Sequence, residues 1–322
     1  TKVVSSGEMT LEQRRLLGVA LVPLLAALLS VSIVNVVLPS VQSTIGASNS
    51  ALQWVLAGYT LAFGVLLVPA GRAGDVYGRG RLFIIGLVLF GAGSLVAGLA
   101  PNTLVLNLAR VGMGLGSGLI NPQTVGLIQQ FFTGKQRGVA FGLFGATVGV
   151  SVAIGPVLGG VLIALLGPEW GWRASFLINV PIVVFAIILA FMWFPKGAWR
   201  ALSSGVPDID PVGTAIFTLA ILFVMLPFLQ HESALTYLLL PVGLMLFAVW
   251  ALWERHYSKK GNEPMVDLAL FRTPSFANGT LLITLQFTGV TSVWVIVAVF
   301  LQQGHDFSAF EAGILGLPAA VV

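Results

Sequence analysis

Residues 71–83 read GRAGDVYGRGRLF, which places three arginines, one aspartate and four glycines between two apolar runs. Charge is scarce elsewhere: Asp, Glu, Lys and Arg make up 9% of the 322 residues, whereas 57% are hydrophobic. A soluble domain covers itself with polar and charged side chains, so this composition predicts a membrane protein. Each flanking run has about the 20 apolar residues that a helix needs to cross a bilayer. We therefore expect the charged stretch at one membrane face, where it can hold helices together or release them.

Apolar runs of this kind recur along the whole chain and predict an all-α polytopic membrane protein. The spans are expected at 16–40, 51–71, 82–100, 103–131, 138–166, 174–194, 211–230, 235–254 and 275–302. A further span begins near residue 309 and is too short to cross, because a helix rises about 1.5 Å per residue. The chain is therefore expected to be the front part of a longer protein.

Two charged segments that contain prolines divide the spans into groups. The expected order is an N-terminal six-helix transmembrane bundle (1–194), a linker (195–210), a two-helix insert (211–254), a second linker (255–274) and the incomplete start of a second bundle (275–322). All sixteen Lys and Arg residues except Arg110 and Arg173 lie toward the same membrane side. Loops rich in Lys and Arg stay in the cytoplasm, so the N-terminus and both linkers are expected to be cytoplasmic in a cell-membrane protein. The net charge of +4 then reflects topology, and the expected partner is the lipid bilayer rather than nucleic acid.

An enzyme or a metal site finds little support in the sequence. The chain has no cysteine, and its three histidines fall in different loops. An intramembrane hydrolase needs a nucleophile and a base at membrane depth, whereas the carboxylates here lie in loops or at span ends. We expect no catalytic residue, no metal ion and no cofactor.

Arg110 is the one ionisable side chain at membrane depth in the first six expected spans. An arginine at that depth is costly and usually faces a cavity or a partner. One interpretation is structural, with Arg110 bound to backbone carbonyls freed by Gly112, Gly114 and Gly116. The other is functional, with Arg110 in a polar central cavity where it senses protonation or an anionic substrate.

The expected span 138–166 is rich in small residues at helical spacing. Its pattern consists of Gly142, Gly145, Gly149, Gly155, Pro156, Gly159 and Gly160. Glycines let helix backbones approach closely in lipid, and proline bends a helix because it removes a backbone donor. The pattern fits either ordinary tight packing or a bending helix on a transport path.

Polar side chains also fall within the expected spans. They are Ser30, Ser32, Asn35, Gln53, Tyr59, Asn121, Gln123 and Gln286. Each of them alone is typical of hydrogen bonding between membrane helices. Together with Trp54 and Trp294 they are candidates for the lining of an amphipathic substrate cavity.

The opening stretch resembles the signature loop between helices 2 and 3 of the major facilitator superfamily, Gly-x-x-x-Asp-x-x-Gly-Arg-basic. Gly71, Asp75, Gly78 and Arg79 match this pattern, and Arg81 follows them. Two positions that are usually basic hold other residues here. The resemblance to this loop is therefore centred on the Asp75 and Arg79 pair.

Further motifs narrow the resemblance to the fourteen-helix drug:proton antiporter family. They are residues 33–39 (IVNVVLP), Gln53-Trp54 with Tyr59, Arg110-x-x-x-Gly114-x-Gly116, Gly155-Pro156-x-x-Gly159-Gly160, residues 172–181 (WRASFLINVP), and Leu301-Gln302 leading to Ala312-Gly313 and Pro318. The resemblance covers essentially the whole chain, and the two-helix insert fits it as well.

The resemblance implies the major facilitator fold, in which two six-helix bundles rock around a central site. Asp75 and Arg79 would tie the cytoplasmic helix ends together in the outward-facing state. Arg110 would lie near the proton-coupling site, and the 138–166 helix would carry the antiporter motif. One departure matters most: the aspartate usual in the family's first helix is Ser30 here, and serine cannot carry the proton.

Three functions remain open at this point. The first is export of amphipathic drugs or small molecules by alternating access, with protons as the candidate coupling ion. The second is export of a lipid or cell-envelope component with unusual or absent proton coupling, which the loss of the first-helix carboxylate suits. The third is a membrane sensor or scaffold that transports nothing, which has little use for Asp75 and Arg79. No oligomeric state is predicted.

Overall fold

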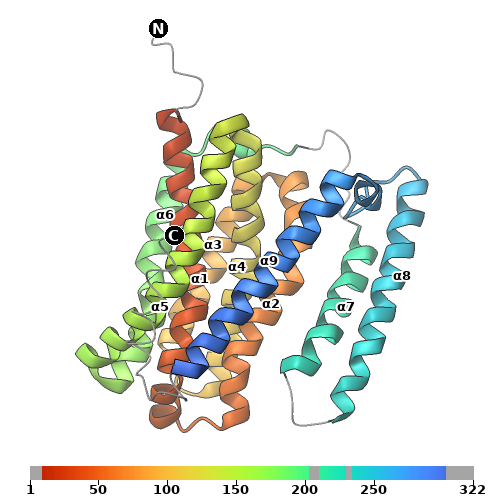
Figure 1. The fold of residues 1–322 in the computed structure, drawn as a ribbon. Helices are drawn as coiled ribbons and strands as arrows, with labels where there is room; N and C mark the ends of the chain where they lie inside the picture. Colours follow the sequence, from red (N-terminus) through yellow and green to blue (C-terminus); the bar gives the residue numbers. More distant parts are fainter. Residues whose placement is uncertain (1–8, 203–209, 230–233, 302–322) are drawn as a thin grey trace. The chain divides into compact units, whose positions relative to one another are not determined.

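The computed structural model is helical throughout most of the residues that it describes, which are 9–202, 210–229 and 234–301. In chain order its helices, with short 3₁₀ turns marked η, are α1 (Leu11–Ile45), α2 (Asn49–Tyr77), α3 (Arg79–Gly98), α4 (Thr103–Phe131), α5 (Gly134–Leu177), α6 (Asn179–Trp193), η1 (Lys196–Trp199), α7 (Pro211–Leu229), η2 (Ala234–Leu238), α8 (Leu239–Lys259), η3 (Leu268–Arg272) and α9 (Pro274–Val299) (Figure 1). The expected all-α fold is confirmed. The further span expected from residue 309 lies outside the described residues.

Seven helical stretches in the described part of the chain are long and apolar enough to cross a membrane, judged by length and composition. One of them is the 60-residue stretch that α5 and α6 form together. Large apolar side chains such as Leu104, Leu165 and Phe191 are exposed on the helix surfaces. Lipid rather than water is the solvent that such surfaces fit, and the protein is a multi-pass membrane protein.

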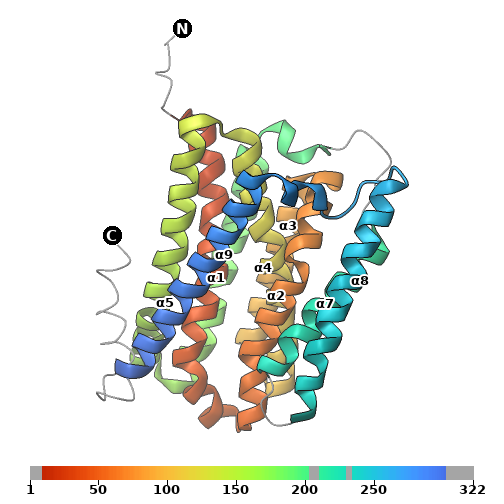
Figure 2. The ribbon, with the colours of Figure 1, turned by 45° about the vertical axis from the view of Figure 1, so that its right-hand side comes forward.

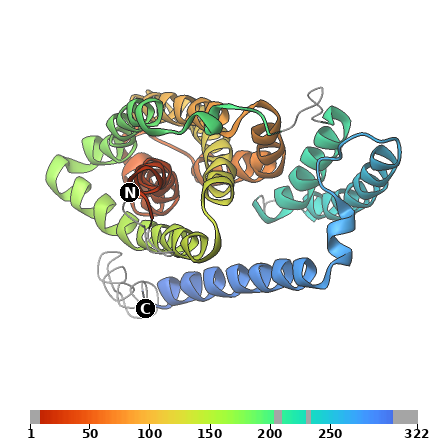
Figure 3. The same ribbon diagram turned by 90° about the horizontal axis from the view of Figure 1, so that it is seen from above.

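The described residues divide into two compact units, the first made of 9–202 and the second of 210–229 and 234–301. In the first unit α1 packs along α5, and α4 packs against both α2 and α3, as the view along the helices illustrates (Figure 3). In the second unit α7 and α8 lie side by side (Figure 2).

Local sequence signals set the ends of the first helix. Thr10 caps α1, because its Oγ1 accepts from Gln13 N at 3.2 Å while Gln13 Oε1 accepts from Thr10 N at 3.0 Å. This reciprocal capping box satisfies two backbone donors that a helix start otherwise leaves free. The helix ends at Ile45 and is capped by Gly46, whose φ of 63° lies in the left-handed region that glycine favours.

The stretch 71–83 is not the loop that its composition suggests. The helix α2 continues to Tyr77 and α3 begins at Arg79, so only Gly78, with φ of 97°, separates them. Glycine adopts this conformation readily, and a β-carbon at this position would lie 2.7 Å from Trp199 O. Glycine and charged residues are typical of loops, but they also occur at helix ends that extend beyond the apolar core of a membrane. The composition of 71–83 therefore does not distinguish a loop from two helix ends.

The helix α5 is longer than predicted and contains one break. The backbone leaves helical geometry at Gly167, with φ of 79° and ψ of 172°, directly before Pro168. Residues around Gly155 and Pro156 keep helical dihedral angles, so the predicted bend there is not a break in the helix. The segment after Gly167 is again helical, and it carries Arg173, which the sequence had placed in a loop.

Candidate functional site

At one end of the first unit, Asp75 and Arg79 form an ion pair across the α2–α3 junction. Arg79 Nη2 donates to Asp75 Oδ1 at 2.6 Å, and the two side chains are 13% exposed for Arg79 and 34% for Asp75. The Arg79 guanidinium lies against Gly126 of α4, where any side chain would displace it. Its Nε is buried and has no hydrogen-bond partner among the described residues. We name Asp75 and Arg79 the latch pair.

The latch pair borders an open pocket of about 340 Å³ between α2 and α4. The other residues of its wall are Leu67, Gly71, Asn121, Pro122, Val125, Gly126 and Gln129. Residues from two separate predictions therefore line the same pocket, since Gly71 belongs to the signature stretch and Asn121 to the candidates for a substrate cavity. Gln123 lies next to this wall but is fully buried, and its Nε2 donates to Ala70 O at 2.7 Å.

The 3₁₀ turn η1 and the residues after it pack over the same end. Leu202 N donates to the backbone oxygen of Asp75 at 2.8 Å, and Trp199 closes over Gly78. Arg81 was expected to join this group, but its side chain is exposed and stands outside the latch pair.

Arg110 is 1% exposed in α4 and contacts α1 and α2. Its Nε donates to Val55 O at 2.9 Å, and its Nη1 donates to Ser30 O at 3.1 Å. Its guanidinium carbon lies 4.3 Å from the centroid of the Tyr59 ring, which is within cation–π range. Among the residues that the structure describes, no carboxylate lies within 4.0 Å of Arg110. The buried cation is therefore held by neutral groups.

These contacts bear on the two interpretations of Arg110. Arg110 does bind backbone carbonyls, but they belong to α1 and α2 rather than to the turns near Gly112 and Gly114. Gly116 serves packing instead, because a β-carbon there would lie 2.8 Å from Phe90 Cα of α3. Arginine stays protonated in proteins, so its charge creates a positive potential inside the bundle.

Ser30, which stands where the resemblance predicts a carboxylate, is fully buried in a neutral network. Its Oγ donates to Ala26 O at 2.9 Å and accepts from Asn179 Nδ2 at 3.0 Å. Nearby, the Tyr59 hydroxyl donates to Ala27 O at 2.8 Å. Asn179 was not among the predicted cavity residues, although it is a polar residue at the start of the apolar α6. The network carries hydrogen bonds and no carboxylate.

The glycine pattern of α5 divides into two groups. Gly155 and Gly159 let α5 approach α1 closely, since a β-carbon on Gly159 would lie 3.0 Å from Ile33 Cγ1. Ser32 secures the same contact, because its Oγ donates to Ser151 O at 3.0 Å. A β-carbon would meet open space at the remaining glycines, which are Gly142, Gly145, Gly149 and Gly160.

The remaining cavity candidates do not gather around Arg110. Asn35 and Gln53 are exposed on the surface of the first unit, and Trp54 is half-buried. Gln286 is exposed on α9 in the second unit, and the Trp294 side chain lies outside the described residues. Asn35, Gln53 and Gln286 each face outward from their helices, so their place in a substrate cavity stays a prediction.

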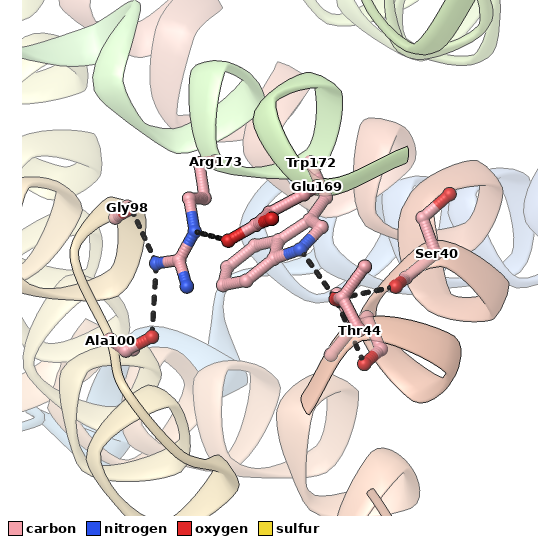
Figure 4. Close-up of polar contacts among 8 residues, drawn as sticks. Ser40, Thr44, Gly98, Ala100, Glu169, Trp172 and Arg173 are labelled. Carbon is pink, nitrogen blue, oxygen red and sulfur yellow. Dashed lines mark hydrogen bonds and ion pairs between the residues drawn. The ribbon is translucent and has the colours of Figure 1, made fainter. Parts of the chain in front are cut away.

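The opposite end of the first unit is held by Arg173 and Trp172 (Figure 4). Arg173 Nη1 donates to Gly98 O at 3.1 Å and to Ala100 O at 3.0 Å, at the end of α3. Its guanidinium carbon lies 4.4 Å from the centroid of the Trp172 ring. Trp172 Nε1 in turn donates to Thr44 Oγ1 at 2.9 Å, near the end of α1. We name the group the Arg173 clasp; it consists of Arg173, Trp172, Gly98, Ala100 and Thr44.

The sequence matches the family model described as Major Facilitator Superfamily over residues 21–322. The chain belongs to the major facilitator superfamily. Because this is a family of membrane transporters, the expectation that the protein is not an enzyme is confirmed.

Curated relatives cover nearly all of this chain. It is 35% identical over 309 residues to the "Probable actinorhodin transporter" of Streptomyces coelicolor, which is 95% of this chain and 53% of that protein. It is 34% identical over 307 residues to the "Puromycin resistance protein pur8" of Streptomyces alboniger, with coverage of 92% and 59%. It is 32% identical over 295 residues to the "Multidrug resistance protein Stp" of Mycobacterium tuberculosis, with coverage of 89% and 52%. The chain thus spans about half the length of the curated relatives that it matches.

Solved structures of peptide transporters share the fold. A POT peptide transporter mutant in complex with alafosfalin matches with a TM-score of 0.54 and 13% identity, over 66% of this chain and 50% of that one. An auto-inhibited POT family peptide transporter matches with a TM-score of 0.52 and 16% identity, over 77% of this chain and 54% of that one. At such identities the likeness concerns the fold and not the substrate.

Proposed function

We propose that the protein is a secondary active exporter of amphipathic drugs or small molecules, of the fourteen-helix drug:proton antiporter type. The observation that carries this proposal is an identity of 31–35% with proteins named for antibiotic transport or resistance, over 89–95% of this chain. We place the protein in the cytoplasmic membrane with its N-terminus and the latch pair on the cytoplasmic side, because Lys and Arg concentrate there.

The geometry of the latch pair supports an alternating-access cycle. Asp75 and Arg79 make one ion pair that is partly exposed and borders an open pocket. An ion pair of this kind contributes only about 0–1 kcal/mol, so a small change in its surroundings can release it. We propose that this pair is intact in one state of the transporter and broken in the other.

Arg110 supports a polar site in the interior of the first unit. Its charge is held by two backbone carbonyls and an aromatic ring, so it can attract an anionic or proton-accepting group without first losing a carboxylate partner. We propose that Arg110 lies at the coupling site. The outward-facing Asn35, Gln53 and Trp54, together with the open glycine face of α5, are the proposed contribution of this unit to the substrate path.

Protons are the proposed coupling ion, but we propose that the residue that carries them is not Ser30 of the first helix. Ser30 and Asn179 hold hydrogen bonds in place of a titrating group. This same observation favours a second candidate function, namely export of a lipid or cell-envelope component with absent or unusual proton coupling.

Drug accumulation in a bacterial host that lacks its own efflux pumps tests the proposal. Cells that produce the protein should retain less puromycin than cells that produce an equally abundant Arg110→Ala variant. A protonophore should remove the difference, because it collapses the gradient that drives export. Equal accumulation in both strains would contradict drug export that depends on Arg110, whereas a difference that survives the protonophore would contradict proton antiport alone.

A further inference from the structure

The second unit buries two carboxylates where α7 begins and α8 nears its end. Asp210 is 0% exposed and Glu254 is 1% exposed. Both residues lie at the ends of expected spans, where the sequence alone predicts ordinary solvated charges. A buried carboxylate must be paired, hydrogen-bonded or neutralised, because removing a charge from water is costly.

Asp210 is fixed in place by neutral donors. Its Oδ1 accepts from Gly213 N at 2.9 Å and from Trp253 Nε1 at 3.0 Å, and its Oδ2 lies 3.1 Å from the same Trp253 nitrogen. Its backbone oxygen also accepts from Thr214 N at 2.9 Å, so Asp210 caps the first turn of α7. The carboxylate is thereby aimed from α7 toward α8.

Glu254 approaches the same place from α8. Its Oε2 accepts from Val266 N at 3.3 Å, whereas its Oε1 is buried and makes no hydrogen bond of good geometry among the described residues, although the buried indole of Trp250, one turn earlier in α8, is a neutral neighbour of this carboxylate. A β-carbon on Gly213 would contact Asp210 Oδ2 and would lie 2.9 Å from Glu254 Oε1. The two carboxyl oxygens therefore face one small space, which the missing side chain of Gly213 leaves open.

The other charged side chains that the structure describes in this unit stay at the surface. The helices α7 and α9 contain none in their described ranges, and Tyr257 of α8 is half-buried and stacks on Trp253. The remaining charged and titratable side chains of α8 and of the segment that follows it are exposed, namely Arg255, His256, Lys259, Lys260, Glu263, Asp267 and Arg272. In the described part of the unit, none of them lies within ion-pair distance of Glu254. No third ligand joins the pair to form a metal site there.

We propose that Asp210 and Glu254 share one proton and form a proton-binding site in the α7–α8 pair. The proton resides on Glu254 Oε1 and makes a hydrogen bond to Asp210 Oδ2. This arrangement gives the unpartnered oxygen a partner and leaves one negative charge in the site, whereas two facing buried carboxylates cannot both ionise readily. The proposal does not depend on the exporter function, because a proton can be bound here whatever the protein transports.

Infrared spectroscopy of the purified protein in lipid nanodiscs tests the site directly. At neutral pH the protein should display the carbonyl band of a protonated carboxyl group, and this band should shift in D₂O. Glu254→Gln should lose the band because an amide replaces the acid. Asp210→Asn should lose it as well, because the amide keeps the contact with Gly213 N and can donate to an ionised Glu254. Asp267→Asn, which alters an exposed carboxylate of the same unit, should retain the band.

Three results would overturn the proposal. One is the absence of a protonated-carboxyl band from the unaltered protein at neutral pH. Another is a band that persists in Glu254→Gln. The third is a thermal stability that rises with added Na⁺ or K⁺ and loses this response in Glu254→Gln, which would assign the site to a monovalent cation. If Glu254→Gln does not fold, Asp210→Asn gives the same decision, because it keeps the cap of α7.

Discussion

The two ends of the first unit are held together in different ways. At the α2–α3 junction, the latch pair is a single contact between two side chains, and the Asp75 side chain is 34% exposed. At the opposite end, the Arg173 clasp joins a side chain to two backbone carbonyls, and Trp172 within it is fully buried. The latch end therefore depends on a contact that water can replace. The clasp end depends on contacts that water cannot easily replace.

This difference indicates which end can change. Breaking the Arg173 clasp would leave carbonyls at the end of α3 without a donor, and an unsatisfied buried group costs about 1–3 kcal/mol. Breaking the latch pair leaves two charges that water in the adjoining pocket can solvate. The clasp is thus the fixed end of the unit, and the latch pair is the end suited to opening and closing.

Removing the centre of the Arg173 clasp should have the largest effect on stability. Trp172→Ala deletes a fully buried ring and its hydrogen bond to Thr44, and truncation of such a residue typically destabilises by about 3–5 kcal/mol. Thermal unfolding of the purified protein in detergent measures the change. The matched control is Trp170→Ala, which removes a ring that is 58% exposed. Equal losses in the two variants would show that the clasp holds nothing together.

Replacing the clasp arginine should have the next largest effect. Arg173→Gln removes the charged donor that serves Gly98 O and Ala100 O, with an expected loss of about 1–3 kcal/mol. Glu169→Gln is the control, because Glu169 Oε1 lies 3.9 Å from Arg173 Nε and its side chain is 63% exposed, so its loss should cost less than about 1 kcal/mol. If Glu169→Gln destabilises as much as Arg173→Gln, the ion pair rather than the carbonyl contacts holds this end.

Breaking the latch pair should have the smallest effect on stability and a large effect on transport. Asp75→Asn should change the free energy of unfolding by about 0–1 kcal/mol, because the pair is partly solvated. Puromycin efflux should nevertheless fall to the level of Arg110→Ala if the pair controls alternation. Arg81→Gln, an exposed position on the same helix end as Arg79, should leave both properties unchanged. An Asp75→Asn variant with normal efflux would contradict the claim that the latch pair controls transport.

Much of the fold could be predicted from the sequence, because membrane helices need apolar runs of fixed length. The expected span 103–131 coincides with α4, and 211–230 lies within one residue of α7. The single-residue turn at Gly78 and the break at Gly167 could not be predicted, because glycine is compatible with both helix and turn. Only the surrounding packing, such as that of Trp199 on Gly78, decides between them.

Arg110 and the latch pair could be selected from the sequence as candidate residues, but their contacts could not. Arg110 was recognised because a charge inside an apolar span is rare. Its partners Val55 and Ser30 lie far away in the sequence. Every residue has a backbone carbonyl, so the residue type does not show which carbonyl accepts the hydrogen bond. The burial of Asp210 and Glu254 was missed for a related reason, since a carboxylate at a span end can face either water or a neighbouring helix.

The central claim is that the latch end of the first unit changes conformation while the Arg173 clasp stays closed. The chain contains no cysteine, so a single Val125→Cys places a label in the pocket beside the latch pair, and Leu99→Cys places one at the clasp. The measurement is the maleimide labelling rate in membrane vesicles with and without a proton gradient. The account predicts that the gradient changes the rate at position 125 several-fold, that Asp75→Asn abolishes this response, and that position 99 does not respond. A rate at position 125 that ignores the gradient, or that responds equally in Asp75→Asn, would contradict it.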